Sequence, residues 1–258
     1  MKRPLIIANW KMRPGNSKEA FDLAKAVAKG VEDLEADVVL CPPFVYISDI
    51  VRASSFARQQ TSYGGSSVAL RSEASGSKTF GVGGQDCFWE QEGPYTGEVS
   101  PVMLRNLGCT HVILGHSERK RYLNETAEMV NAKIKAVLQQ GLIPVVCVDE
   151  PEQNLELLLK GISQSELKNS VLVYEPAWAI STSHGQAATP KLLKETAAFM
   201  KKFIPAQTPI LYGGSVESRN IKSFLGPELG QGVLVGGASL QAKEFVTLVK
   251  NASIALAP

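Results

Sequence analysis

The chain has 258 residues, of which 44% are hydrophobic and 20% are charged. These proportions are typical of a globular protein with a large core and not of a disordered chain. The formal net charge is only +2 and both signs are interspersed along the chain, which argues against a nucleic-acid-binding arm or a membrane-binding tract. No apolar run is long enough for a signal peptide or a membrane span, so we expect neither nucleic acid nor membrane as a partner.

Apolar, strand-like runs alternate with helix-periodic runs, which is the pattern of repeated βα units. The predicted strands cover residues 5–9, 38–41, 80–85, 111–115, 143–148, 171–174, 210–212 and 233–235. The helical runs between them are predicted at 17–30, 46–53, 101–107, 125–140, 152–160 and 190–203, and a helical run follows each of the last two strands. Ser17 is the predicted N-cap of the first helix, because a hydroxyl there precedes the apolar period.

Eight βα units in a chain of 258 residues predict an α/β fold, a single (β/α)₈ barrel domain spanning residues 1–258. A doubly wound open sheet is the alternative. The barrel is favoured because unusual polar residues and glycines come just after strands, and a closed barrel brings the ends of all its strands to one face. These residues are Asn9, Lys11, His116, Glu175, Ser215, Gly236 and Gly237.

The sixth predicted strand ends in a carboxylate. Residues 171–174 are continuously apolar, and Glu175 and Pro176 follow directly. A carboxylate at the carboxyl end of a strand buried on both faces, followed by a short loop, is typical of a general base beneath a lid. A helix cap or a structural ion pair is the alternative for a loop glutamate.

An insertion of about residues 54–78 separates the second helix from the third strand. It is rich in Ser, Gly, Gln and Ala, and this composition is typical of a flexible segment. Its place in the chain predicts that it lies on the amino-terminal face of the barrel, remote from the strand ends. We therefore expect its deletion to affect stability or assembly more than turnover.

The four cysteines are widely spaced, with no CxxC pair: Cys41, Cys87, Cys109 and Cys147. This spacing favours neither a zinc site nor a disulfide framework. We expect no metal and a reducing, cytoplasmic location.

Several motifs together carry a resemblance to a known family. They are ANWKM at 8–12, CPPF at 41–44, PYTGEVSP at 94–101, GHSER at 115–119, YEPAWAI at 174–180, YGGSV at 212–216 and LVGGASL at 234–240. In this order and over nearly the whole chain, they resemble the triosephosphate isomerase family. The resemblance implies a TIM barrel, a cytoplasmic isomerase of glycolysis and gluconeogenesis, a small triose-phosphate substrate and no cofactor.

The resemblance also implies the catalytic residues. Glu175 would be the base that abstracts a C–H proton through an enediolate, and neutral His116 the electrophile that polarises the carbonyl. Asn9 and Lys11 would stabilise the developing oxyanion, while Glu118 would hold Lys11 or His116 in place. Taken alone, His116 would be read as a structural histidine, Lys11 as a solvated lysine and Glu118 as a first-turn helix carboxylate.

Phosphate binding and closure are implied by the same motifs. Besides Asn9 and Lys11, the implied substrate-binding residues are Ser181, Ser215, Gly236 and Gly237, since paired glycines after the last two barrel strands commonly present backbone N–H groups to a phosphate. The implied lid consists of Pro176, Ala177, Trp178, Ala179, Ile180, Ser181 and Thr182. Closure of this lid would exclude water from the enediolate.

The third loop resembles the family segment that enters a neighbouring subunit. Thr96 would then contact the partner's site, which implies a homodimer. Three positions depart from the family pattern, since Ser181 and Ser183 replace lid glycines and Asp149 replaces the glycine of CVGE. A non-catalytic phosphosugar-binding barrel and a structural protein that assembles through the insertion are the alternatives to an isomerase.

Overall fold

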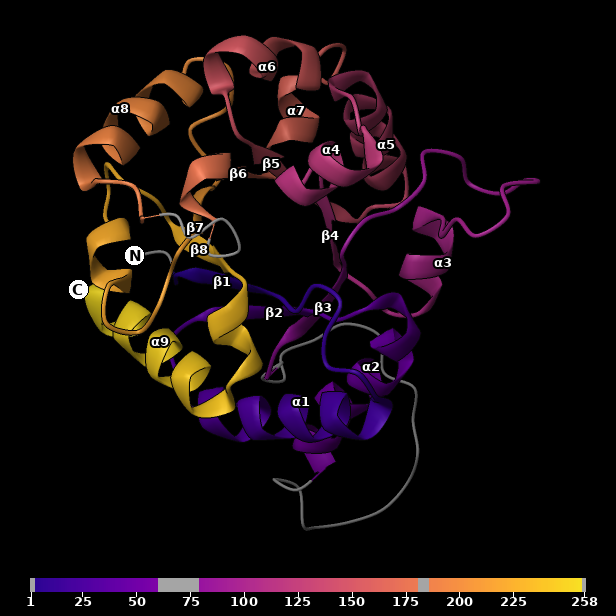
Figure 1. The fold of residues 1–258 in the computed structure, drawn as a ribbon, viewed down its shortest axis with the longest axis vertical. Coiled ribbons are helices and arrows are strands. Elements are labelled where there is room, and N and C mark those ends of the chain that lie inside the picture. The colour runs from indigo at the N-terminus through magenta and orange to yellow at the C-terminus, as the bar shows by residue number, and fades with distance from the viewer. Residues whose placement is uncertain (1–2, 60–78, 181–185, 257–258) are drawn as a thin grey trace.

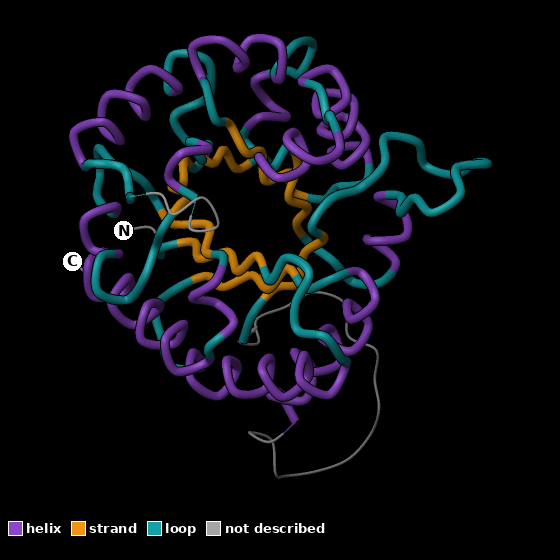
Figure 2. Tube along the Cα trace, viewed as in Figure 1, coloured by secondary structure: helices purple, strands orange, loops and turns teal. Residues whose placement is uncertain are grey.

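The computed structural model describes residues 3–59, 79–180 and 186–256, and within 55–59 the backbone alone. Eight parallel strands form a closed barrel in chain order, and β1 pairs with β8 (Figure 2). They are β1 (Leu5–Asn9), β2 (Asp37–Cys41), β3 (Gly81–Gly84), β4 (His111–Leu114), β5 (Ile143–Val148), β6 (Val171–Tyr174), β7 (Ile210–Gly214) and β8 (Gly232–Val235). The predicted (β/α)₈ barrel is confirmed, and the open sheet is excluded because both edges are paired. Residues 60–78 of the predicted insertion lie outside the described residues.

The helices form a ring around the strands (Figure 1). They are α1 (Ser17–Val31), α2 (Ile47–Gln59), α3 (Pro101–Asn106), α4 (Ser117–Leu123), α5 (Ala127–Gln139), α6 (Pro151–Leu158), α7 (Gln164–Leu167), α8 (Pro190–Met200) and α9 (Ala242–Ala255). Short 3₁₀ turns stand at η1 (Phe44–Tyr46), η2 (Ala177–Ala179), η4 (Ile221–Phe224) and η5 (Gly237–Leu240). The sequence did not predict α4 or α7, because helices this short carry too few turns to show a period.

Two apolar clusters hold the layers together. One fills the inside of the barrel with residues such as Ile7, Ile113 and Val173. The other packs the outer faces of the strands against the helices and includes the fully buried Trp10 and Phe245. Because strand residues alternate between these two clusters, the strands are apolar on both faces over most of their length, as expected for parallel strands covered on both sides.

The first helix begins differently from the prediction. Asn16 is the N-cap of α1, and its side-chain oxygen accepts a hydrogen bond from the backbone N–H of Glu19 at 2.9 Å. Ser17 is the first helical residue, so its predicted role as the cap is wrong. Both residues can cap a helix, and the one that keeps an extended backbone, Asn16 with φ −147° and ψ 160°, takes the role.

The carboxyl ends of the strands open onto one face, which places Asn9, Glu175 and Gly214 close together although they follow three different strands and lie far apart in the chain. The long loop between β3 and α3 projects well beyond the ring of helices (Figure 1). The fold therefore offers a shared face for chemistry and a separate protrusion beside it.

Candidate active site

Glu175 follows β6 directly and is buried. Its backbone N–H donates to the carbonyl of Val148 at 2.9 Å, which fixes the residue against the end of β5. One carboxylate oxygen, Oε1, lies 3.1 Å from Nε2 of His116. The other, Oε2, accepts hydrogen bonds from the backbone N–H and the hydroxyl of Ser117, each at 3.3 Å. The carboxylate is thus oriented by the loop that follows β4.

His116 is the N-cap of α4, and its Nδ1 accepts a hydrogen bond from the backbone N–H of Glu118 at 3.2 Å. A ring nitrogen that accepts this bond carries no proton, so the proton of the neutral ring is on Nε2. Nε2 is the nitrogen that faces Glu175. The start of α4 therefore sets both the orientation and the tautomer of the imidazole.

Lys11 lies just past β1 in a left-handed backbone conformation, with φ 53°, which is unusual for a residue with a side chain. Its N–H donates to Oδ1 of Asn9 at 2.9 Å, and its carbonyl accepts from Nε2 of Gln85 at 2.8 Å. The Lys11 ammonium lies 2.7 Å from Oε1 of Glu118. These contacts aim a positive charge at the space beside Glu175.

Gln85 was not among the sequence-predicted site residues. Its side-chain amide donates to the carbonyls of both Lys11 and Cys41, each at 2.8 Å, and so joins the loops after β1 and β2. One signal could have identified it, since Gln85 is a polar residue at the end of the third predicted strand, in the same position that drew attention to Asn9 and Glu175.

Two opposing influences act on the pKa of Glu175. Burial by itself raises the pKa, whereas the adjacent His116, the Ser117 N–H and Lys11 favour the carboxylate. The second set prevails, and the pKa of Glu175 is held below its ordinary value. The group is consequently ionised at neutral pH although it is enclosed by protein.

The cavity at this site is small. It measures about 20 Å³, and its lining residues are Asn9, Lys11, His116, Glu175, Ile180, Gly214, Leu234 and Gly236. A wider hollow of about 720 Å³ adjoins it through Gly214 and Gly236, and Ser215 and Gly237 also line that hollow. The structure therefore joins a tight cavity to a roomier one at the ends of β7 and β8.

The glycine pair at the end of β7 makes room for neighbouring groups. A Cβ on Gly213 would approach Cγ1 of Val173 to 2.9 Å and Cβ of Glu175 to 3.2 Å. A Cβ on Gly214 would lie 2.4 Å from the hydroxyl of Tyr212. Gly213 therefore makes room for Glu175 and Gly214 makes room for Tyr212, quite apart from any phosphate.

The described part of the predicted lid ends at Ile180, while Ser181, Thr182 and Ser183 lie outside the described residues. Within it, Trp178 is 52% exposed, whereas Ala179 is buried. The carbonyl of Ala179 accepts hydrogen bonds from the backbone N–H of Ser215 at 2.9 Å and from its hydroxyl at 3.0 Å. The lid segment is thereby attached to the loop after β7.

Other predicted features are placed as follows. Thr96 is exposed in the projecting loop, away from the cavity around Glu175. Within residues 3–59, 79–180 and 186–256, no helix could cross a bilayer. The same residues contain no group of three or more His, Cys, Asp or Glu side chains arranged to hold a metal ion.

Comparison with known proteins identifies the family. The family model described as triosephosphate isomerase matches residues 4–252. The chain belongs to the triosephosphate isomerase family. It is 39% identical to the triosephosphate isomerase of Moorella thermoacetica, over 96% of this chain and 98% of that protein. It is 37% identical to that of Caldanaerobacter subterraneus subsp. tengcongensis, over 96% of this chain and 99% of that protein.

A solved structure of the same family has the same fold. The crystal structure of triosephosphate isomerase from Bartonella henselae superposes with a TM-score of 0.76 at 29% identity, covering 96% of this chain and 98% of that one. The resemblance found in the motifs is thus confirmed over nearly the full length of the chain.

One departure from the family motifs lies beside this site. Asp149, which stands in place of the glycine of CVGE, accepts a hydrogen bond from the ammonium of Lys120 at 2.7 Å. Lys120 belongs to α4, the helix whose first residues contact Glu175 and Lys11. In this member of the triosephosphate isomerase family, an ion pair therefore connects α4 to the end of β5.

Proposed function

We propose that this chain interconverts glyceraldehyde 3-phosphate and dihydroxyacetone phosphate, with Glu175 as the base. The observation that carries the proposal is the position of a buried, ionised carboxylate in one cavity with the ring of His116 and the ammonium of Lys11. Moving a carbonyl to the adjacent carbon needs a base for the C–H proton and a stabilised oxyanion. The family membership supports the same reaction.

The first step is proton abstraction by Glu175 to form an enediolate. In the structure, the Glu175 carboxylate is 3.1 Å from Nε2 of His116, the nitrogen that bears the ring proton. When substrate enters, the Nε2–H donates instead to the substrate oxygen on which negative charge develops. His116 thus acts as a neutral electrophile, and Glu175 returns the proton to the adjacent carbon.

Lys11 stabilises the charge that develops on the same oxygen, because an ammonium in a water-poor site interacts strongly with an oxyanion. Its ion pair with Glu118 positions the ammonium, and Asn9 supports the backbone of Lys11 through its side-chain oxygen. Asn9 and Glu118 therefore support the charge on Lys11 in this proposal.

The phosphate occupies the wider hollow, where Ser215, Gly236 and Gly237 lie at the ends of β7 and β8. Ser215 donates its N–H to the carbonyl of Ala179 in the structure. Phosphate that takes this N–H must replace the Ala179 carbonyl, and this exchange couples phosphate binding to movement of the lid. Ser181, which lies outside the described residues, completes the phosphate site in the proposal.

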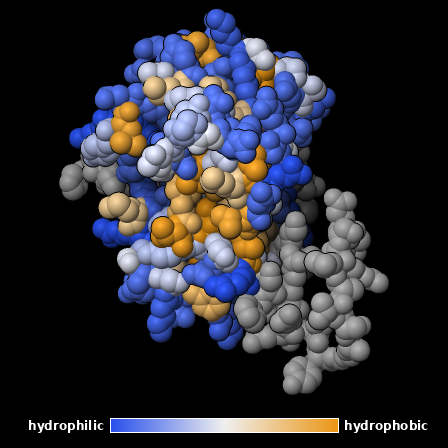
Figure 3. Space-filling model, turned by 90° about the vertical axis from the view of Figure 1, so that its right-hand side faces the viewer, coloured by the Kyte–Doolittle hydropathy of each residue, from blue (hydrophilic) through white to orange (hydrophobic). Residues whose placement is uncertain are grey.

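The functional unit in this proposal is a cytoplasmic homodimer. Exposed apolar side chains from the loops after the neighbouring strands β1, β2 and β3 include Met12, Val45 and Tyr95, and Met103 of α3 adds to them. Apolar surface gathers on this side of the molecule (Figure 3), as it does at subunit interfaces. The projecting loop would carry Thr96 to the partner. The four unpaired cysteines support a reducing compartment.

A coupled assay with glyceraldehyde 3-phosphate tests the isomerase activity. We expect turnover by the wild type and a loss of about 10²-fold or more in kcat for both Glu175→Asp, which withdraws the carboxylate by one methylene, and His116→Gln. Glu152→Asp, a change at an exposed residue of α6, is the matched control and keeps full activity. A wild type without turnover, as expected of a phosphosugar-binding barrel, or two active-site variants with unchanged rates would refute the proposal.

A further inference from the structure

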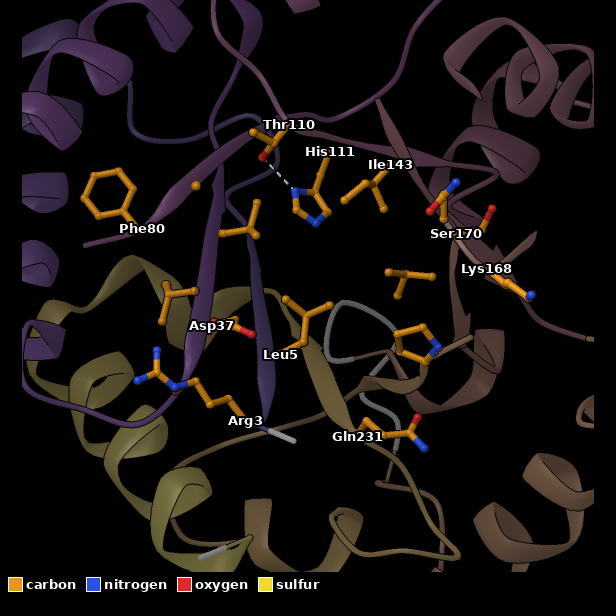
Figure 4. Close-up of a pocket in the computed structure, with 17 residues that line it drawn as sticks. Arg3, Leu5, Asp37, Phe80, Thr110, His111, Ile143, Lys168, Ser170 and Gln231 are labelled. Atoms are coloured by element: carbon orange, nitrogen blue, oxygen red, sulfur yellow. Dashed lines mark hydrogen bonds between the residues drawn. The ribbon is translucent and has the colours of Figure 1, made fainter. Parts of the chain in front are cut away.

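A second cavity lies at the opposite end of the barrel from Glu175. It measures about 720 Å³ and is lined at the amino ends of the strands by Leu5, Val39, Gly81, His111, Ile143 and Val171. Figure 4 shows these strands converging around an open space. Its volume is in the range of small-molecule sites, and it shares no lining residue with the cavity around Glu175.

The walls of this cavity are mainly apolar, and the two basic side chains among its lining residues do not point into it. Leu5, Ile143 and Val171 border the apolar cluster inside the barrel. At the rim, the guanidinium of Arg3 forms an ion pair with Glu35 at 2.6 Å. The side chain of Lys168 extends away from the middle of the cavity (Figure 4). An apolar body fits this space better than a highly charged one.

The ring of His111 is a polar group directed into the space (Figure 4). Its Nδ1 lies 2.8 Å from the hydroxyl of Thr110, and that hydroxyl donates its only hydrogen to the carbonyl of Val82 at 3.3 Å. The arrangement that keeps both contacts as hydrogen bonds has Nδ1–H donating to the hydroxyl, and in that tautomer Nε2 of His111 is a hydrogen-bond acceptor. No residue of the described part of the chain donates a hydrogen bond to it.

Burial lowers the pKa of His111 to about 4. The ring is therefore neutral at physiological pH, and Nε2 keeps its lone pair. A carboxylate placed here would meet a second acceptor and lose its hydration without compensation, whereas a hydrocarbon would leave Nε2 unpaired.

We propose that this cavity is a binding site for a small, neutral aromatic molecule with one O–H donor, of the phenol class. The aromatic ring lies against Leu5, Ile143 and Val171, and the hydroxyl donates to Nε2 of His111. A rigid ring loses less conformational freedom on binding than a flexible chain of equal area. The site is independent of the isomerase activity, because it involves none of the residues around Glu175.

Titration of the full chain with three naphthalene derivatives tests the chemistry. 2-Naphthol has the donor, 2-methoxynaphthalene has the same ring system without it, and 2-naphthoate is an anion of similar size. We expect 2-naphthol to bind about tenfold more tightly than 2-methoxynaphthalene, the effect of one hydrogen bond, and 2-naphthoate to bind more weakly than either. Excess inorganic phosphate leaves these affinities unchanged. Failure of 2-naphthol to bind, or competition by phosphate, would overturn the proposal.

Substitution of the acceptor tests its location. In His111→Leu, whose fold is checked by thermal melting, the preference for 2-naphthol over 2-methoxynaphthalene falls to about one, while 2-methoxynaphthalene binds as before. In His111→Gln, whose amide oxygen can accept, part of the preference returns. An undiminished preference in a folded His111→Leu protein would place the ligand elsewhere.

Nitrogen-15 spectra of histidine-labelled wild type provide a test that needs no variant. The chain has three histidines, and 2-naphthol is expected to shift the Nε2 resonance of His111 while that of His116 stays in place. 2-Methoxynaphthalene leaves both unchanged. Binding of 2-naphthol without a shift at His111 would contradict the assignment.

Discussion

Lys11 shows how the proposed active site depends on single residues. Its left-handed backbone is held by Asn9 on one side and by Gln85 on the other, so its ammonium is aimed by contacts to its own main chain as well as by Glu118. Strained conformations of this kind persist where the surroundings determine them, and they concentrate at functional sites. Gln85 is therefore a positioning residue for Lys11, although it does not line the cavity around Glu175.

The acid limit of activity depends on the contact between His116 and Glu175. Because neighbours hold the pKa of Glu175 below its ordinary value against the effect of burial, the base stays ionised and kcat/KM falls only when pH drops below the usual glutamate range. His116→Gln removes the imidazole hydrogen bond that favours the carboxylate, so burial raises the pKa of Glu175 and the acid limb of kcat/KM moves to higher pH. The profiles of kcat/KM against pH for wild type, His116→Gln and the control Glu152→Asp measure this shift. An acid limb that moves to lower pH in His116→Gln would contradict the prediction.

A buried ionic cluster connects elements on one side of the barrel. Lys133 of α5 donates to both carboxylate oxygens of Asp86, at 2.9 and 2.8 Å, and also contacts Glu125. Arg119 of α4 reaches Asp86 at 2.9 Å and Glu125 at 3.1 Å. The cluster anchors α4, the helix that begins at the proposed active site, to the loop after β3.

Loss of the central cation should destabilise the protein strongly at neutral pH. Lys133→Met leaves Asp86 and Glu125 buried with only Arg119 between them, and we expect the free energy of unfolding to fall by about 3–5 kcal/mol at pH 7.5. Burial already raises the pKa of Asp86 to about 6, despite Lys133. A pKa that is higher in the folded state than in the unfolded state means that the folded state takes up a proton first as pH falls. The loss in free energy of unfolding caused by Lys133→Met therefore becomes smaller toward pH 5.

Urea unfolding at pH 7.5 and pH 5, at one protein concentration, measures the effect of Lys133→Met. Lys25→Met, at an exposed position of α1, is the control and changes stability by less than about 0.5 kcal/mol. A penalty for Lys133→Met that grows toward pH 5 would show that the carboxylates do not take up protons there.

At the scale of the whole molecule, the exposed apolar residues near the projecting loop should govern assembly. Val45 is 78% exposed, and a charge there would be buried without a partner in the proposed dimer. We expect Val45→Asp to weaken self-association by at least tenfold. Sedimentation over a range of concentrations measures this, and Ile254→Asp, at an exposed apolar residue of α9 on another side of the molecule, is the matched control. Equal association of both variants would place the interface elsewhere.

The strand and helix pattern determined the barrel, because periodicity is local and eight βα units of this length close in few ways. The sequence motifs likewise predicted Glu175, His116 and Lys11 as site residues, since each follows a strand, and the three line one cavity. What the tertiary structure decided depends on partners far apart in the chain. Glu118 could have paired with either Lys11 or His116, and its carboxylate lies 2.7 Å from Lys11 but 3.7 Å from His116.

The same reason explains the features that the sequence did not predict. Gln85 contacts Lys11 across 74 positions, Lys133 meets Asp86 across 47, and the cavity at His111 exists only where strands from the whole chain converge. Patterns along the chain report which face a residue occupies, because that depends on the local backbone. They do not report which distant group fills the remaining hydrogen-bond position, because closure of the barrel decides that contact.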